Sequence, residues 1–177
     1  MLKHLKASPN PETLRILGVD PGYDRMGIAV LEKPLRGPEK ILYSDCITTN
    51  TTLSFPDRLT HIGEAVAKTI AHYRPNHLSI EDLYLTKNQK TAMRVSAARG
   101  VILYEAARAG LLVHEFTPLQ IKIAITGFGR GDKRAVSTMV KRLLNLPEKR
   151  RLDDEYDALA VALTGSAHLK VTMKQGR

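Results

Sequence analysis

The 177-residue sequence predicts an α/β fold, with one mixed five-stranded sheet flanked by helices on both faces. Two observations indicate this fold. Three strand-like apolar runs come first, separated only by turns rich in Pro and Gly, as in antiparallel hairpins. Helical and strand-like segments then alternate, and parallel strands need such crossovers. The length and a composition of 43% hydrophobic and 25% charged residues are those of a single globular domain.

The first half of the chain supplies the antiparallel strands and the first crossover. "RILGVD" is almost continuously apolar and ends at Pro21-Gly22, as a buried strand does. Apolar residues then recur at helical spacing between Pro56 and Tyr73. The expected elements are, in order, strands at 15–20, 26–33 and 40–48, a helix at 56–73 and a strand at 77–84.

The second half continues the alternation. We expect a long helix at 87–109, a strand at 112–116, a short helix from Pro118, a helix at 132–144 and a last helix from about Asp153. The first, fourth and fifth strands are then mutually parallel, and this order of elements is that of the RNase H-like fold. The predicted organisation is a flexible leader at 1–13, a single RNase H-like domain at 14–168 and a flexible basic tail at 169–177.

The charge balance indicates a polyanionic partner. Lys and Arg number 27 against 18 Asp and Glu, a formal net charge of +9. Cys46 is the single cysteine, which fits a reducing compartment. No apolar run approaches the roughly 20 residues of a membrane helix, so we expect no membrane partner. We expect a cytoplasmic, nucleoid-associated protein, and the weakly basic start keeps an organellar targeting peptide as an open alternative.

Acidic residues stand where two predicted strands end. Asp20 closes the first strand and Glu81 the fourth. If these strands are parallel neighbours, their carboxyl ends lie about 5 Å apart, at the edge where open α/β sheets place their sites. Asp20 alone also fits a turn former before Pro-Gly, whereas Glu is seldom buried without a partner. Two buried carboxylates at such a short distance repel each other unless a proton or a cation lies between them.

The last helix adds two more carboxylates. Asp154 and Asp157 are three residues apart and share one side of a helix. Asp153 is an alternative to Asp154, but we place Asp154 in the site and Asp153 at the helix cap. Clusters of oxygen ligands suit Mg²⁺ or Mn²⁺. Two such ions about 4 Å apart promote phosphodiester hydrolysis, so acidic residues converging in a basic protein predict a nuclease.

Four stretches of the chain resemble the RuvC family of Holliday junction resolvases. They are "ILGVDPGYDRMGIAV", "SIEDLYLTKN" followed by "ARGV", "QIKIAITGFGRGDKRAV" and "DDEYDALAVAL", and they cover most of residues 15–165 in the family's order. The resemblance implies a Mg²⁺-dependent endodeoxyribonuclease, with Mn²⁺ able to substitute, that resolves four-way junctions by paired nicks in recombination and repair. The metal-binding catalytic set that it implies is Asp20, Glu81, Asp154 and Asp157.

The resemblance and the glycine loop together predict the DNA contacts. The family's aromatic residue falls on Tyr84, which could stack on an unpaired base, and two family lysines fall on Lys122 and Lys133. The loop "TGFGRG" permits close approach of its backbone to phosphate at a helix amino terminus. Tyr23 and Asp24 replace a Ser and a basic residue of the family pattern, so the local DNA contacts are expected to differ from those of the family. Lys87, Lys90 and Arg94, which come just before the apolar helical stretch 97–110, are expected to line a DNA-facing groove of a dimer. The expected DNA-binding residues are therefore Tyr84, Lys87, Lys90, Arg94, Lys122, Arg130, Lys133 and Arg134.

Further partners and other functions follow from the same features. The helical stretch 97–110 is apolar around much of its circumference and needs a second partner surface, so we expect a homodimer with two sites for two DNA strands. A branch-migration motor stays open as a further partner. The alternative functions are another RNase H-like nuclease, acting on RNA or flap DNA, and a non-catalytic junction-binding protein. The six histidines and one cysteine have no zinc-ligand spacing.

Overall fold

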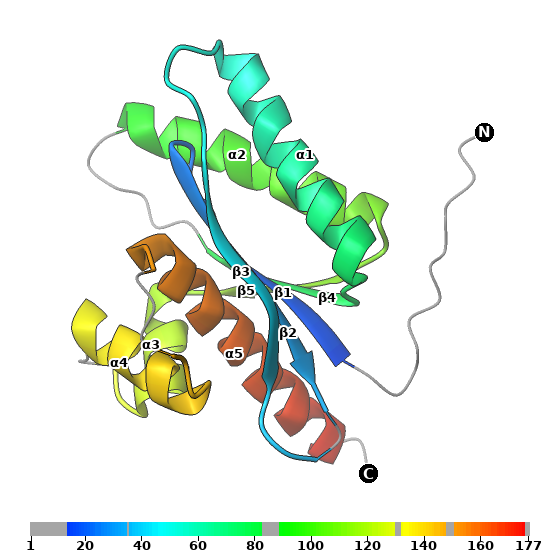
Figure 1. The fold of residues 1–177 in the computed structure, drawn as a ribbon, viewed down its shortest axis with the longest axis vertical. Helices are drawn as coiled ribbons and strands as arrows, with labels where there is room; N and C mark the ends of the chain where they lie inside the picture. Colours follow the sequence, from blue (N-terminus) through cyan, green and yellow to red (C-terminus); the bar gives the residue numbers. More distant parts are fainter. Residues whose placement is uncertain (1–13, 35, 83–88, 130–131, 148–150, 176–177) are drawn as a thin grey trace.

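The computed structural model places one five-stranded sheet between two helical layers (Figure 1). It describes residues 14–34, 36–82, 89–129, 132–147 and 151–175, with side chains up to residue 169. Three of the expected DNA contacts, Tyr84, Lys87 and Arg130, lie outside the described residues, as does the expected leader at 1–13.

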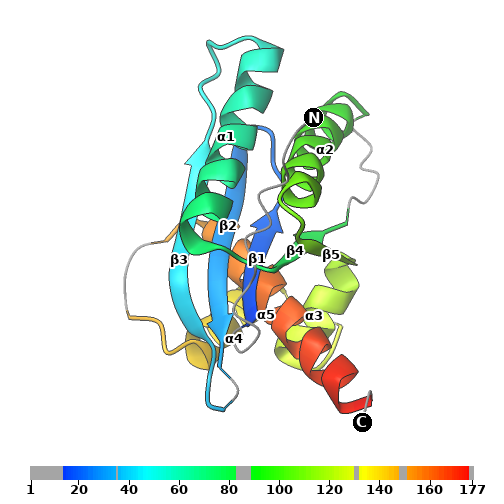
Figure 2. The same cartoon turned by 90° about the vertical axis from the view of Figure 1, so that its right-hand side faces the viewer.

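The strand order is β3-β2-β1-β4-β5, which can be followed across the sheet in Figure 2. The strands are β1 (Leu14–Asp20), β2 (Arg25–Lys33), β3 (Lys40–Thr48), β4 (His77–Glu81) and β5 (Leu112–Phe116). β2 pairs antiparallel with β1 and with β3, whereas β4 is parallel to β1 and β5 is parallel to β4. The mixed five-stranded sheet predicted from the sequence is therefore confirmed.

Helices cover both faces of the sheet (Figure 1). α1 (Phe55–Tyr73) and α2 (Gln89–Arg108) pack on one face; on the other lies α5 (Asp153–Gln175), with α3 (Pro118–Thr126) and α4 (Lys133–Leu143) outside it. The alternation along β2 produces two cores, because Ile28 and Val30 face α1 and α2 while Ala29 and Leu31 face α5.

The helix boundaries follow local sequence chemistry. Ser54 caps α1 by accepting a hydrogen bond from the Asp57 amide. Thr117 and Gln120 form a reciprocal capping box at the start of α3, and Gly127, at φ 82°, ends that helix. The Asp132 Oδ1 accepts from the Ala135 amide at 2.7 Å and so begins α4. These caps fix where α4 starts, and its first residue is Lys133.

The last helix runs further than the sequence analysis placed the end of the domain. α5 continues to Gln175, so it extends into the segment expected to be a basic tail. After Gly165 the sequence has no glycine or proline before Gly176, so no helix-breaking residue ends α5 earlier. In the described part of the chain, none of the helices has the length and apolarity needed to cross a bilayer.

Candidate active site

The sheet register brings Asp20 and Glu81 to neighbouring positions. Val19 of β1 lies opposite Ile80 of β4 in the parallel ladder, and the two carboxylates are the next residues of their strands. Ser79, two residues before Glu81, packs against α5 at Gly165. Because side chains alternate along a strand, Asp20 and Glu81 both project toward the α5 face of the sheet.

Two glycines let α5 lie directly on the β1–β2 hairpin. A Cβ atom added to Gly27 would lie 1.9 Å from the carbonyl oxygen of Asp154, and one added to Gly18 would lie 2.5 Å from that of Ala158. Any larger residue would push the helix away from the strands. Gly27 pairs with Asp20 across the hairpin, so the same close approach brings the start of α5 to the end of β1.

Four carboxylates share one electrostatic environment at this point. The pKa of Asp20 is raised to about 7, first by burial and then by the negative charges of Glu81, Asp157 and Asp154, against a smaller opposing effect of Lys133. The pKa of Glu81 is also raised, first by burial and then by Asp157. Such mutual repulsion requires that the four groups lie near one another. The structure therefore places the other three carboxylates of the predicted acidic set within electrostatic range of Asp20.

Two basic side chains partly neutralise this cluster. The Lys133 Nζ lies 2.9 Å from the Asp157 Oδ2, and the Arg25 Nη2 lies 3.2 Å from the Asp154 Oδ2. The hydrogen bond to Asp157 raises the pKa of Lys133 above its ordinary value, although partial burial opposes it. Both pairs show that the carboxylates attract positive charge.

The donor set fits a hard divalent cation. All four groups are carboxylates, the oxygen ligands that Mg²⁺ and Mn²⁺ prefer, and their repulsion is relieved by added positive charge. As the side chains stand, no three Asp, Glu, His or Cys groups of the described residues are close enough to hold one ion. Asp154 and Asp157 are paired with Arg25 and Lys133 in this arrangement.

Asp153 does not occupy the cap position expected for it. It is the first residue of α5 and is exposed, and the amides of Glu155 and Tyr156 bond to the Leu152 carbonyl. Its charge acts on Lys133, whose pKa it raises, whereas Asp154 raises the pKa of Asp20. An acidic residue in the first turn still complements the helix dipole.

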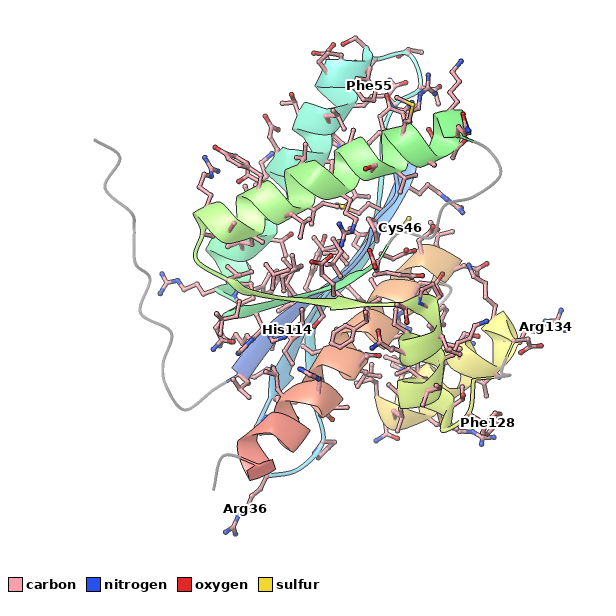
Figure 3. The ribbon with its side chains drawn as sticks, turned by 180° about the vertical axis from the view of Figure 1, so that it is seen from behind. Arg36, Cys46, Phe55, His114, Phe128 and Arg134 are labelled. Carbon is pink, nitrogen blue, oxygen red and sulfur yellow. The ribbon has the colours of Figure 1, made fainter. Side chains whose placement is uncertain are left out.

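The predicted DNA-binding residues that the structure describes divide into two groups. Lys122 and Lys133 adjoin the acidic cluster, since both lower the pKa of Glu81. Arg134 is the next residue of α4 and extends into solvent (Figure 3). Lys90 and Arg94 are exposed on the first turns of α2, which packs on the other face of the sheet from α5, and the Arg94 Cζ lies 5.4 Å from the ring centroid of Tyr23.

Tyr23 and Asp24, which differ from the residues expected in the family pattern, have a structural role. Tyr23 is buried, and the Arg58 Cζ lies 3.9 Å from its ring centroid. The Arg58 guanidinium also pairs with Asp24, and its Nε donates to Thr49 at 2.8 Å. These residues tie the turn after Asp20 to α1, so the departure serves packing. The role of Arg58 was not predicted from the sequence, because Tyr23 and Asp24 lie 35 and 34 residues away in the chain.

Two neighbours of Asp154 were also not predicted from the sequence. Arg25 begins β2, and a hairpin register drawn from the sequence would have placed it at the same end of the sheet as Asp20. The Cys46 Sγ lies 3.8 Å from the Asp154 Oδ2, on β3 beside α5 (Figure 3). No sequence signal pointed to Cys46, since strand position alone does not identify a partner on a distant helix.

Comparison with known proteins agrees with this geometry. The family model described as crossover junction endodeoxyribonuclease RuvC matches residues 16–165. The protein of that name from Thermosipho melanesiensis is 46% identical over 149 residues, covering 84% of this chain and 94% of its own. The one from Finegoldia magna is 42% identical over 150 residues, covering 85% and 91%.

Solved structures show the same similarity. T. thermophilus RuvC in complex with a Holliday junction substrate matches with a TM-score of 0.84 and 28% identity, over 90% of this chain and 96% of that one. The yeast mitochondrial Holliday junction resolvase Ydc2 shares the fold, with a TM-score of 0.65 and 16% identity over 93% and 83% of the two chains. The chain therefore belongs to the RuvC family of crossover junction endodeoxyribonucleases.

Proposed function

We propose that this protein is an endonuclease that cuts four-way DNA junctions by paired nicks, with Mg²⁺ or Mn²⁺ held by Asp20, Glu81, Asp154 and Asp157. One observation carries the proposal: two strand ends and one helix bring four carboxylates together in a chain with a net charge of +9. The names of the relatives and the junction bound by T. thermophilus RuvC support this substrate.

The four carboxylates provide sites for a pair of ions. When bound, the ions supply positive charge to the reacting phosphate and lower the pKa of the attacking water, with no covalent enzyme intermediate. Asp20, with its pKa raised to about 7, would give up its proton to bind such an ion. Arg25 and Lys133, which pair with Asp154 and Asp157, would then be displaced from these carboxylates.

The basic side chains around the carboxylates hold the DNA. Lys133 and Lys122 lie beside the carboxylates and neutralise phosphate oxygens next to the scissile bond. Arg134 is exposed on the same helix as Lys133 and contacts a phosphate further along the strand. Tyr84, Lys87, Lys90, Arg94 and Arg130 complete the proposed DNA-binding set.

We also propose that two copies of the chain act together through α2. The sheet and α1 bury Ala98, Ile102 and Ala106 of this helix, while Tyr104 is 62% exposed. A second copy related by a two-fold axis would cover that face and provide one site for each of two strands. Sedimentation equilibrium at micromolar concentration is expected to show dimers for the native chain and monomers for Tyr104→Glu. Dimers of equal stability for both proteins would contradict this interface.

The function is tested with a synthetic immobile four-way junction that carries a label on each strand in turn. We expect paired nicks with Mg²⁺ or Mn²⁺ and none with a chelator. Asp20→Asn is expected to bind the junction without cutting it, and Glu64→Gln, an exposed carboxylate on α1, serves as the control. Equal or faster cutting of flap, duplex or RNA–DNA hybrid substrates would favour another nuclease activity, and junction binding with no cutting in any metal would favour a binding protein.

A further inference from the structure

Arg99 belongs to α2, but its side chain reaches the carboxyl end of β4. Its Nε donates to the backbone carbonyl oxygen of Glu81 at 3.3 Å. Its Nη2 pairs with Glu115 of β5 and lies 3.6 Å from the Asp82 Oδ1. The side chain is only 14% exposed, unlike the basic residues at the start of α2. Arg99 is therefore built into the fold behind one of the four carboxylates.

The pairing of β4 explains why the Glu81 carbonyl needs this donor. The Asp82 amide donates to Phe116 and the Asn76 carbonyl accepts from Leu112, so the even-numbered residues of β4 bond to β5. The odd-numbered residues, Glu81 among them, are directed toward β1.

On the β1 side the ladder meets a proline. Val19 lies opposite Ile80 in the parallel ladder, and every second residue of β1 bonds to β4. The amide that would donate to the Glu81 carbonyl is therefore that of residue 21. Residue 21 is Pro21, and it has no N–H to donate. The turn that follows Asp20 thus leaves the carbonyl of Glu81 without a ladder partner, and Arg99 supplies one from outside the sheet.

An arginine suits this position because its donors lie in one rigid plane. The Nε binds the carbonyl while the outer nitrogen binds Glu115 and approaches Asp82. A lysine has a single ammonium group and cannot serve both places in this geometry. The contact therefore fixes the backbone of Glu81 relative to α2 and β5 together.

We propose that Arg99 is a positioning residue for Glu81, replacing the amide that Pro21 lacks and holding the Glu81 carboxylate where it can bind a divalent ion. This inference rests on the proposed function for the role of Glu81 as a metal ligand. It assigns Arg99 no contact with DNA or with the reacting phosphate.

The diagnostic variant is Arg99→Lys, which keeps the positive charge beside Glu115 but loses the Nε donor. Isothermal titration of Mn²⁺ into the DNA-free protein is expected to show binding weaker by on the order of 10-fold. Junction affinity, measured without metal, is expected to stay unchanged. Arg108→Lys is the matched control, because Arg108 lies on the same helix and pairs with Glu105 at the surface, and its Mn²⁺ affinity is expected to equal that of the native chain.

A metal-free measurement separates this inference from the proposed function. Hydrogen exchange of the Asp82 amide, which bonds to Phe116 at the end of β4, is expected to speed up in Arg99→Lys. Exchange at Ile28, in the buried centre of β2, is expected to stay the same. If both amides exchange faster by the same factor, Arg99 only adds general stability and the positioning role is wrong.

The remaining outcomes also decide the question. Glu115→Gln keeps the Nε contact while removing an anchor of the guanidinium, so its loss of Mn²⁺ affinity is expected to be smaller than that of Arg99→Lys. Unchanged Asp82 exchange in Arg99→Lys, or unchanged Mn²⁺ affinity where the native chain binds Mn²⁺, overturns the inference. If the native chain binds no Mn²⁺ and cuts no junction while Asp82 exchange responds as expected, the proposed function fails and the structural role of Arg99 stands.

Discussion

Two groups of titratable side chains lie on the same face of the sheet, one at each end of β4. Glu81 ends the strand beside Asp20, Asp154 and Asp157. His77 begins it, and the His77 Nδ1 lies 3.0 Å from the His114 Nε2 on β5. The His168 ring on α5 lies 5.5 Å from that of His114.

The two groups respond to burial in different ways. Burial lowers the pKa of His77 and of His114, so both rings stay neutral and share one hydrogen bond. Burial and neighbouring carboxylates both raise the pKa of Asp20 and Glu81, while Arg25 and Lys133 pair with Asp154 and Asp157 at that end. A neutral buried pair is satisfied by its own contacts, whereas a crowded set of acids still requires a cation. This difference distinguishes the proposed metal-binding end of the sheet from the histidine end.

The largest effect is expected from Asp20→Asn, which removes one of the four charges without changing side-chain size. Cleavage of a four-way junction in Mg²⁺ is expected to fall by at least ~10³-fold, because stabilisation by a bound metal contributes several kcal/mol to such reactions. Gel assays of cleavage and of binding measure the two properties separately. The matching change at the other end, His77→Gln, is expected to leave cleavage within about twofold, and a comparable loss in both variants would remove the distinction between the ends.

The second effect is a pH dependence confined to the acidic end. The pKa of Asp20 is raised to about 7, so at lower pH the residue holds a proton that an incoming ion must displace. Mn²⁺ affinity is therefore expected to fall by roughly tenfold for each pH unit below 7 and to level off above it. Calorimetric titrations between pH 5.5 and 8 measure this. In Asp20→Asn the dependence is expected to be much weaker, and an equally steep slope in that variant would assign the proton to another group.

A moderate effect is expected from the basic residues around the acidic end. Removing Lys122 or Arg134 as alanine variants deletes one phosphate contact each, so the slope of log Kd against log salt for junction binding should decrease by about one. Fluorescence anisotropy across a salt series measures the slope. Lys68→Ala, on the α1 side of the molecule, is the control and should keep the native slope.

The smallest effect is expected at the histidine end and concerns stability. The folded state lowers the pKa of His77 below 6.5, so the unfolded chain binds protons more readily in that range. The free energy of unfolding is expected to fall as the pH drops from about 6.5 toward the lower folded pKa, and to be insensitive to His77 at higher pH. Urea unfolding at several pH values is expected to show a flatter fall in His77→Gln than in His61→Gln, an exposed control on α1. Identical curves would mean that His77 does not contribute.

Much of the fold was predictable from the sequence, because the strands are apolar runs that lie between recognisable turns. "RILGVD" and "LVHEF" became β1 and β5, and the crossover rule fixed which strands are parallel. The acidic set was also predictable, since Asp20 and Glu81 close strands and Asp157 lies one turn inside a helix where capping does not explain it. The end of α5 and the position of Asp153 differ from expectation because helix boundaries depend on a few local contacts.

The supporting residues could not have been predicted in the same way. Arg25, Arg58 and Arg99 look like ordinary surface residues in the sequence, and their roles depend on partners that fold next to them from elsewhere in the chain. The need for Arg99 becomes visible only when the strand register sets Pro21 opposite the Glu81 carbonyl. Register between distant strands is a tertiary property that hydrophobic patterns alone do not supply.

The central claim is that the four carboxylates form one cation-binding cluster, and the titration of Asp20 tests it most directly. Carbon-13 NMR of the Asp20 carboxyl group across a pH series gives its pKa with and without Mg²⁺. We expect a midpoint near 7 in the metal-free protein and a marked decrease when Mg²⁺ is added. A midpoint near the ordinary value of 3.8, or one that Mg²⁺ leaves unchanged, would contradict the account.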